Sequence, residues 1–441
     1  MDLERINKRT VEMILQFSIP SIIAMVLTSF ITIVDGFFIG NYVGKEGIAA
    51  VNLGLPILYI YLAIGIMISV GGIAIAGMAL GAQDFKKSNE VFNQTVSTTM
   101  IVSILLSLCV WLAFRSIMDL VNMNAQVADC FYRYYSIMIL AYPVMILNSS
   151  LGMFIRGEGK PQLFMLINML TVICNVILDY LFIRWLHLGI EGIAFASLIS
   201  LIIGLLNMIL FFLKKSSIYK FSRFKFSKTV LRNTLLNGSS EFIGQISMSI
   251  SMFAYNWVIL RIAGVAGVAA FTIVGYVAYL FNMVIIGFGQ GASPLISFSY
   301  GGGEIGLSQR IRKKTNLFVF CSGAVVIFLM LIASDWYSDV FVANKHVANL
   351  IHSGVCIFIL SFLFSGVNTI TSFFFTSIGK AKESALISIS RGLVVLLICI
   401  FTLPNIFGMT GVWLVAPVTE AITMVLSIVL IRQFERRLQH V

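Results

Sequence analysis

Long stretches without a charged residue constrain this chain more than any other feature. Examples are Ile48–Leu80, Leu317–Ser334 and Gly392–Met409. A helix needs about 20 apolar residues to cross the roughly 30 Å of hydrocarbon in a bilayer. With 59% hydrophobic and 11% charged residues, a water-soluble fold would expose large apolar patches. We therefore expect an all-α polytopic membrane protein with lipid as its solvent.

Twelve segments of the sequence fit membrane-spanning helices. They cover residues 12–38, 48–79, 91–114, 131–155, 162–183, 190–213, 235–260, 268–298, 315–334, 348–376, 384–403 and 411–431. Of the 30 Lys and Arg, 23 fall on the side that holds both termini, six fall on the opposite side, and Arg391 lies within a span. Cytoplasmic loops are enriched in Lys and Arg. Both termini are therefore expected in the cytoplasm, and the net charge needs no nucleic-acid partner.

The two halves of the chain repeat with an offset of 220 residues. The pattern G-x-x-G-x-A-A at Gly44–Ala50 recurs at Gly264–Ala270. The register continues through the pairs Ser88/Ser308, Thr95/Thr315, Asn148/Asn368 and Phe154/Phe374, and after one deletion Gly189 and Gly192 meet Gly408 and Gly411. Each half holds six spans, so the halves are parallel repeats related by an axis along the membrane normal.

The repeat predicts a domain organisation of two homologous lobes. We expect an N-terminal six-helix lobe over residues 1–213 (the N-lobe), a basic cytoplasmic linker over 214–232, and a C-terminal six-helix lobe over 233–441 (the C-lobe). The linker interleaves seven Lys and Arg with aromatic residues, a composition that suits a segment lying on anionic headgroups.

A duplicated membrane lobe favours a carrier, because two lobes can rock about a site held between them. The sequence contains no HExxH, GxSxG or Walker A motif, so we expect a secondary active transporter and not an enzyme. The energy for transport would then come from an ion gradient.

Four acids lie inside predicted spans, where an ionisable group is costly and marks a functional hypothesis. Asp35 ends the stripe Ser21–Thr28–Thr32–Asp35, and Asp179 ends the stripe Asn168–Thr171–Asn175–Asp179. These spacings keep each stripe on one helical face. We expect the two faces to meet in a hydrated pocket of the N-lobe. The alternative is that both acids sit at span ends and are wetted by headgroups.

The other two acids, Glu241 and Glu420, belong to the C-lobe. Arg391 lies at a similar depth, which makes an ion pair with Glu420 a candidate structural feature. Glu241 has the polar neighbours Ser239, Ser240 and Gln245 and is the candidate for a C-lobe cation or substrate site. No in-span acid has an acidic counterpart in the other half, so the lobes share a fold but not a site.

Four motifs resemble those of the multidrug and toxic compound extrusion (MATE) transporters, in particular the DinF/MepA-like bacterial branch. They are P-S-I-I…V-D-G-F-F-I-G at 20–40, F-I-R-G-E-G-K-P at 154–161, N-V-I-L-D-Y-L-F-I at 175–183 and G-V-W-L-V-A-P-V-T-E at 411–420. The resemblance implies two six-helix bundles around a V-shaped cavity. It also implies multidrug efflux, with its link to antibiotic resistance, by exchange of lipophilic organic cations for H⁺ or Na⁺.

The resemblance also implies a cation-coupling site in the N-lobe. The matching residues are Asp35, Asn175 and Asp179, with Ser197 where the family commonly has Thr. Glu241 resembles the seventh-span Glu of the NorM-type branch, but Val367–Ser377 contains no acid to complete a NorM-like Na⁺ site.

We expect a monomer in the bacterial inner membrane, with the bilayer and organic cations as partners and no cofactor except the coupling ion. H⁺ and Na⁺ both stay open as that ion. A lipid-linked oligosaccharide flippase is the alternative. A flippase of that type would have a more cationic cavity, whereas the spans of this chain contain four acids and one base. An intramembrane enzyme or a receptor is a further alternative, but the outer loops are too short for an ectodomain.

Overall fold

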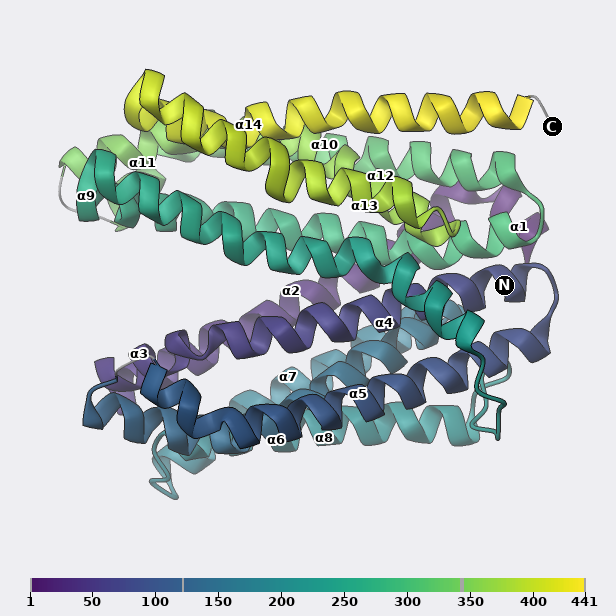
Figure 1. The fold of residues 1–441 in the computed structure, drawn as a ribbon, viewed down its shortest axis with the longest axis horizontal. Helices are drawn as coiled ribbons and strands as arrows, with labels where there is room; N and C mark the ends of the chain where they lie inside the picture. Colours follow the sequence, from purple (N-terminus) through teal and green to yellow (C-terminus); the bar gives the residue numbers. More distant parts are fainter. Residues whose placement is uncertain (1, 121–122, 342–344, 440–441) are drawn as a thin grey trace.

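The structure is a computed structural model that describes residues 2–120, 123–341 and 345–439, and these residues are almost entirely helical (Figure 1). The first half contains α1 (Leu3–Lys8), α2 (Thr10–Tyr42), α3 (Lys45–Leu53), α4 (Leu55–Gly81), α5 (Phe85–Leu120), α6 (Ala125–Gly157), α7 (Pro161–Arg184) and α8 (Ile190–Lys214). The second half contains α9 (Lys228–Gly301), α10 (Ile305–Phe341), α11 (Lys345–Phe358), a 3₁₀ turn η1 (Ile359–Ser361), α12 (Phe362–Ser377), α13 (Ala381–Ile389), a π-helical turn η2 (Ser390–Val394) and α14 (Val395–Gln439).

Among the described residues, ten helical segments are long and apolar enough to cross a membrane. Two of them, Lys228–Gly301 and Ala381–Gln439, have 74 and 59 residues, far more than one crossing needs. The first turns at Gly264 (φ 61°, ψ −153°) and the second at Gly408 (φ 58°, ψ −134°). Each therefore supplies two spans, and the total of twelve confirms the predicted fold class.

The backbone repeats in the two halves as the sequence does. Three pairs of positive φ angles are separated by the 220-residue offset: Gly44 with Gly264 (96° and 61°), Gln83 with Gly303 (61° and 81°), and Gly159 with Gly379 (90° and 76°). A fourth pair, Gly189 with Gly408 (61° and 58°), follows the one-residue deletion. One side-chain hydrogen bond recurs as well. Asn148 donates to the Leu201 carbonyl and Asn368 to the Glu420 carbonyl, each at 2.8 Å. The duplication is thus a duplication of structure.

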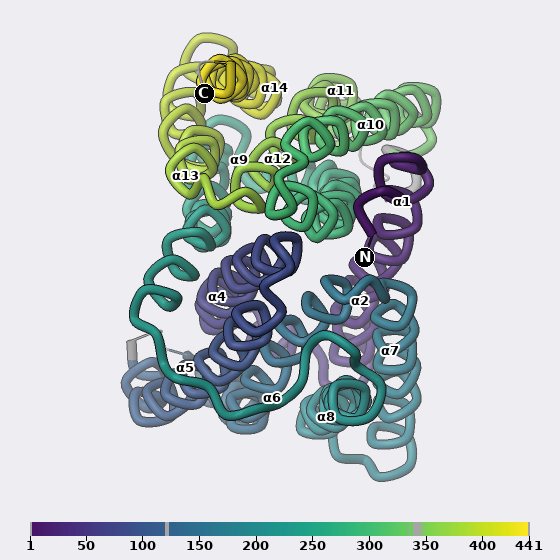
Figure 2. Tube along the Cα trace, turned by 90° about the vertical axis from the view of Figure 1, so that its right-hand side faces the viewer, coloured from purple at the N-terminus to yellow at the C-terminus, as the bar shows by residue number. Residues whose placement is uncertain are grey.

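The two halves form separate helical bundles, and both termini lie at one end of the molecule, here called the terminal end (Figures 1 and 2). The lobes meet where α2 and α4 pack against α9. At Gly238, an added Cβ would lie 1.8 Å from the Met67 carbonyl oxygen, and at Gly71 it would lie 1.9 Å from the Thr234 carbonyl oxygen. Only glycine permits so close an approach of two backbones. These contacts close the lobes against each other along the terminal half of α4.

Residues Lys215–Ser227 join the lobes without helical structure and follow the surface of the N-lobe (Figure 2). Helix α9 begins at Lys228, inside the range predicted for the linker, because the Ser227 hydroxyl caps its first turn at the amide of Val230 (3.3 Å). The segment is held by side chains of α5. Asn93 donates to the Lys220 carbonyl (2.9 Å) and Gln94 to the Ser227 carbonyl (2.9 Å).

Tyr219 anchors the middle of this segment. Its side chain is fully buried against Phe92 and Phe154. Burial raises the pKa of Tyr219, so its phenol stays neutral. The basic residues of the segment and Phe226 point outward. The linker is therefore fastened to the N-lobe, and its basic face remains exposed.

Candidate functional site

The four predicted N-lobe residues come from three neighbouring helices. Asp35 lies on α2, Asn175 and Asp179 lie one turn apart on α7, and Ser197 lies on α8. Helix α7 packs against both α2 and α8. Asn175 and Asp179 are wholly buried, Ser197 is nearly so, and Asp35 is half-buried. The fold thus brings all four side chains into one place.

A chain of hydrogen bonds connects three of these residues. The Asn175 amide donates to the Ser197 hydroxyl (3.4 Å), and that hydroxyl donates to Oδ2 of Asp35 (3.3 Å). Both bonds are long, at the limit at which a hydrogen bond still contributes. Ser197 therefore orients one oxygen of Asp35 from a neighbouring helix and leaves the other oxygen free.

The carboxyl groups of Asp35 and Asp179 are close enough to interact electrostatically, although no hydrogen bond joins them. An ionised carboxylate only accepts hydrogen bonds, so two ionised groups would repel at this separation. Both oxygens of Asp179, Oδ1 of Asp35 and Oδ1 of Asn175 are buried without a hydrogen-bond partner among the described residues. The site therefore presents several oxygen acceptors, of which two can share a proton and more than two can coordinate a hard cation.

Tyr134 of α6 is a neighbour that the sequence did not single out. It is buried and lies within electrostatic range of both Asp35 and Asp179. In the sequence, Tyr134 belongs to the aromatic cluster Phe131–Tyr135, which indicates only hydrophobic packing. The fold is what places Tyr134 near two acids.

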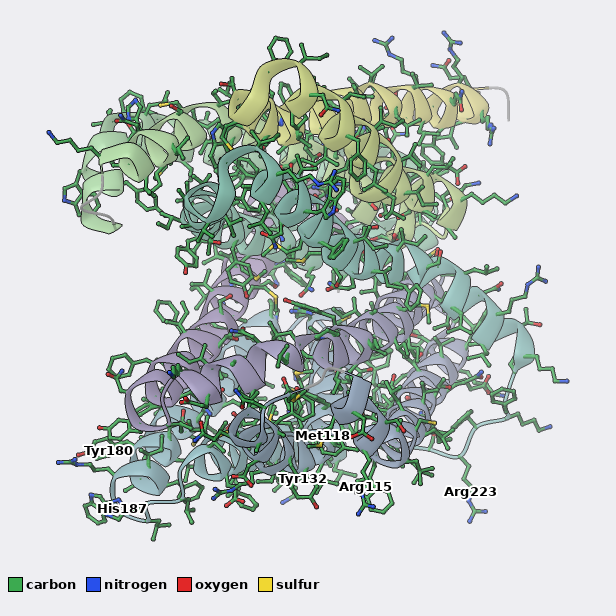
Figure 3. The ribbon with its side chains drawn as sticks, turned by 60° about the vertical axis from the view of Figure 1, so that its left-hand side comes forward. Arg115, Met118, Tyr132, Tyr180, His187 and Arg223 are labelled. Atoms are coloured by element: carbon green, nitrogen blue, oxygen red, sulfur yellow. The ribbon has the colours of Figure 1, made fainter. Side chains whose placement is uncertain are left out.

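The polar stripes below these acids form hydrogen bonds mostly within their own helices. Ser21 donates to the Phe17 carbonyl and Thr28 to the Ala24 carbonyl, both at 2.8 Å. On α7, Thr171 donates to the Ile167 carbonyl (3.0 Å). Figure 3 shows Tyr180, next to Asp179, at the end of the molecule opposite Arg223 of the linker. The acid pair thus lies in the half of the N-lobe away from the terminal end.

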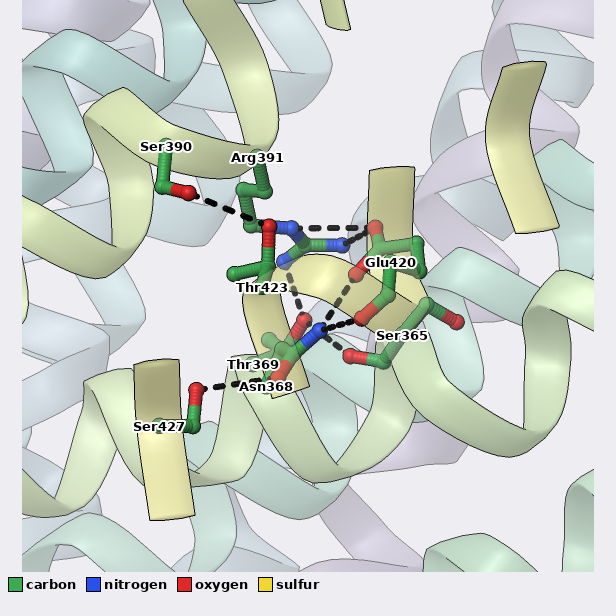
Figure 4. Close-up of polar contacts among 8 residues, drawn as sticks. All are labelled: Ser365, Asn368, Thr369, Ser390, Arg391, Glu420, Thr423 and Ser427. Atoms are coloured by element: carbon green, nitrogen blue, oxygen red, sulfur yellow. Dashed lines mark hydrogen bonds and ion pairs between the residues drawn. The ribbon is translucent and has the colours of Figure 1, made fainter. Parts of the chain in front are cut away.

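In the C-lobe, Arg391 and Glu420 form an ion pair with an N–O distance of 2.6 Å (Figure 4). Asn368 donates to the second oxygen of Glu420 (2.7 Å), and Arg391 also donates to the Thr369 hydroxyl. Ser427 donates to the Asn368 side-chain oxygen (2.9 Å). Arg391 belongs to the π-helical turn η2, a distortion often found at functional sites.

Glu241 lies on α9, half-buried and within electrostatic range of Arg391. The guanidinium is already paired with Glu420, so the group of three carries a net negative charge. Glu241 is thus an acid of the C-lobe whose charge no close partner balances among the described residues. Neither Asp35 nor Asp179 is among the charged groups that act on Glu241.

Comparison with known proteins links this arrangement to one family. The family model MatE matches residues 20–181 and 242–401, one block in each lobe. Two multidrug export proteins MepA are similar along nearly their whole lengths: that of Staphylococcus haemolyticus is 24% identical over 96% of this chain and 94% of its own, and that of Staphylococcus saprophyticus is 25% identical over 95% and 93%.

Solved structures share the fold. A MATE transporter in the straight conformation superposes with a TM-score of 0.92 and 23% identity, covering 97% of both chains. An outward-facing multidrug resistance transporter of the MATE family, in the MOP superfamily, gives a TM-score of 0.91 at 22% identity, covering 97% of this chain and 96% of its own.

Proposed function

Because the chain belongs to the MatE family, we propose that it is a secondary active transporter that exports lipophilic organic cations in exchange for H⁺ or Na⁺. Its similarity to multidrug export proteins along nearly the full chain supports the export of drugs. The excess of in-span acids over in-span bases supports a cationic substrate. The charge asymmetry of the loops supports cytoplasmic termini.

The observation that carries the coupling proposal is the pair of carboxyl groups, Asp35 and Asp179, in a buried site rich in unpartnered oxygens. Without a bound cation, two adjacent carboxylates repel each other and are only partly hydrated. A proton shared between them, or a Na⁺ held by both acids and the Asn175 and Ser197 oxygens, relieves both penalties. Occupancy therefore changes how closely α2, α7 and α8 can pack.

We infer that this change in the N-lobe is coupled to the contacts between lobes. Helix α2 carries Asp35 and also packs against α9 of the C-lobe. At Gly287 and Gly291 of α9, an added Cβ would lie 2.6 Å from backbone atoms of Ile22 and Ser18 in α2. A shift of α2 on cation binding is thus transmitted to the surface along which the lobes part. Alternating access follows if the lobes rock about this surface.

The test is transport by variants that keep the shape of the site and remove its charge. We expect Asp35→Asn and Asp179→Asn to lose ethidium efflux while reaching the membrane in normal amounts. Asp119→Asn, which changes an exposed acid at the end of α5, is the matched control and should transport normally. Full efflux by both site variants would remove the N-lobe acids from the mechanism.

The choice between H⁺ and Na⁺ needs purified protein in proteoliposomes. A pH gradient and a Na⁺ gradient are imposed separately, and ethidium movement is followed for each. The gradient that drives transport in the wild type, and not in the Asp35→Asn and Asp179→Asn variants, identifies the coupling ion.

A further inference from the structure

Arg156, at the end of α6, is a buried cation in the contact surface between the lobes. Only 2% of its surface is exposed. It lines a cavity together with Val70 and Ile73 of α4, Gln290, Ser293 and Pro294 of α9, and Phe373 of α12. The walls thus come from both lobes, so any parting of the lobes at the terminal end opens this cavity.

No acid balances the charge of Arg156 among the described residues. Its Nη1 is buried without a hydrogen-bond partner, and its close favourable contact is with the face of Phe164, 4.3 Å from the guanidinium carbon. A cation–π contact is worth about 2 kcal/mol when desolvated, well below the several kcal/mol needed to bury an ion. Arg312 in the C-lobe, which is comparably buried, lies 3.6 Å from Glu435.

The repeat shows that the fold does not require a charge at this position. The counterpart of Arg156, 220 residues later, is Thr376. Its hydroxyl is hydrogen-bonded to Ser384 (2.7 Å) and Ser240 (3.1 Å) within the C-lobe. The same scaffold position therefore holds a satisfied neutral group in one lobe and an unsatisfied cation in the other.

The other polar groups of the cavity fit an anion beside the guanidinium. The Gln290 side-chain oxygen is buried without a partner as placed. Since the two ends of an amide can be exchanged by a flip, its N–H groups can face the cavity instead. The Ser293 hydroxyl is already engaged with Ser377 at 2.6 Å, and the remaining walls are apolar.

We propose that Arg156 and Gln290 form a binding site for a small monovalent anion, of which chloride is the type, and that this anion stabilises the conformation closed at the terminal end. The cavity holds about 10 Å³, room for a single particle of about the size of water. Chloride is larger than a water molecule, so the cavity walls must adjust slightly to admit it, but a carboxylate or phosphate group would require a much larger adjustment. When the lobes part, water hydrates the guanidinium and the anion is free to leave.

The site is tested with purified full-length protein in lipid nanodiscs. Thermal stability is measured in potassium gluconate with increasing replacement by potassium chloride, at constant ionic strength and K⁺ concentration. A ligand that binds only the folded state raises the Tm in a saturable manner. We expect a rise of about 2 °C in the wild type and in Arg310→Gln, a change to an exposed arginine, and no rise in Arg156→Gln. Gln290→Leu should shift saturation to higher chloride.

A second measurement does not depend on a variant that folds. Crystals grown in bromide should show an anomalous peak beside Arg156. The proposal is overturned if chloride and gluconate give the same Tm in the wild type, if Arg156→Gln responds as the wild type does, or if the bromide peak lies elsewhere. The Asp35→Asn/Asp179→Asn double variant should keep the chloride response, so failure of the cation-coupling proposal is distinguishable from failure of this one.

Discussion

At the scale of single residues, Ser197 holds the N-lobe site together. It accepts a hydrogen bond from Asn175 and donates one to Asp35, so it links α7, α8 and α2. A hydrogen bond to a charged group contributes about 1.5–3 kcal/mol at normal length, and the 3.3 Å bond to Asp35 contributes less than that. Ser197 is uncharged, so it affects cation binding through its position between Asn175 and Asp35.

We therefore expect Ser197→Ala to weaken binding of the coupling cation by up to about tenfold, since 1.4 kcal/mol corresponds to a factor of ten. The quantity to measure is the H⁺ or Na⁺ concentration that gives half-maximal ethidium efflux. Ser197→Thr keeps the hydroxyl and should behave nearly as the wild type does. Equal half-maximal concentrations for the wild type and Ser197→Ala would show that the relay is not used.

Arg391 and Glu420 show the opposite case, an ion pair whose two charges are best removed together. Their side chains are 24% and 12% exposed. Loss of one partner from a wholly buried pair costs about 3–5 kcal/mol, and partial exposure reduces this. Arg391→Met and Glu420→Leu should each lower the Tm, while Arg391→Met/Glu420→Leu should recover part of the loss. Additive losses in the double variant would mean that the two residues do not stabilise each other.

At the scale of elements, the contact of α4 with α9 decides whether the terminal end can close. At Gly238 an added Cβ would lie 1.8 Å from a backbone oxygen of α4, while at Gly244, on the same helix, it would meet nothing within 4 Å. The two glycines therefore differ in packing and not in backbone conformation, which makes them a matched pair.

Gly238→Ala should hold the terminal end open, because over-packing a tight contact costs about 1–3 kcal/mol. A reporter cysteine at Ser297, buried in the lobe contact opposite Gly77, is expected to react at least about fivefold faster with a maleimide. In Gly244→Ala the rate should be unchanged. Slow labelling in Gly238→Ala would show that the contact adapts without parting the lobes.

At the scale of the whole molecule, the proposed mechanism requires the lobes to move as two bodies. Lys45 and Val265 occupy equivalent positions of the repeat, and both are exposed. Spin labels on cysteines at these positions in a cysteine-free background report the distance between lobes. We expect two distance populations whose ratio changes with the coupling ion in the wild type and stays constant in Asp35→Asn/Asp179→Asn.

Labels at Lys45 and Leu186, both in the N-lobe, are the control and should give one distance under all conditions. If the interlobe distances of the wild type do not respond to pH or to Na⁺, the N-lobe acids do not drive rocking of the lobes.

The sequence by itself determined the class of the molecule and much of its plan. A helix that crosses lipid must be long and apolar, so the twelve spans can be recognised in the sequence as long apolar segments. A duplication leaves a constant offset between matching residues, so the two repeated lobes can be recognised in the sequence as well. The helical period and the in-span acids placed Asp35, Asn175 and Asp179 in one expected pocket of the N-lobe. The family resemblance added Ser197, and the structure places the four together.

Only the tertiary structure decided which side chains meet across large separations in sequence. In the sequence, Arg156 looks like an ordinary basic residue of a loop, but in the structure α4, α9 and α12 surround it. Tyr219 reads as part of a linker on the membrane surface until α5 and α6 enclose it. The sequence does not show why the glycines at the lobe contact are needed. In the structure, the backbone of a second helix lies directly against them. The spacing of apolar and polar residues predicts which face of a helix is buried. It does not predict these contacts, because they depend on how the two lobes pack against each other.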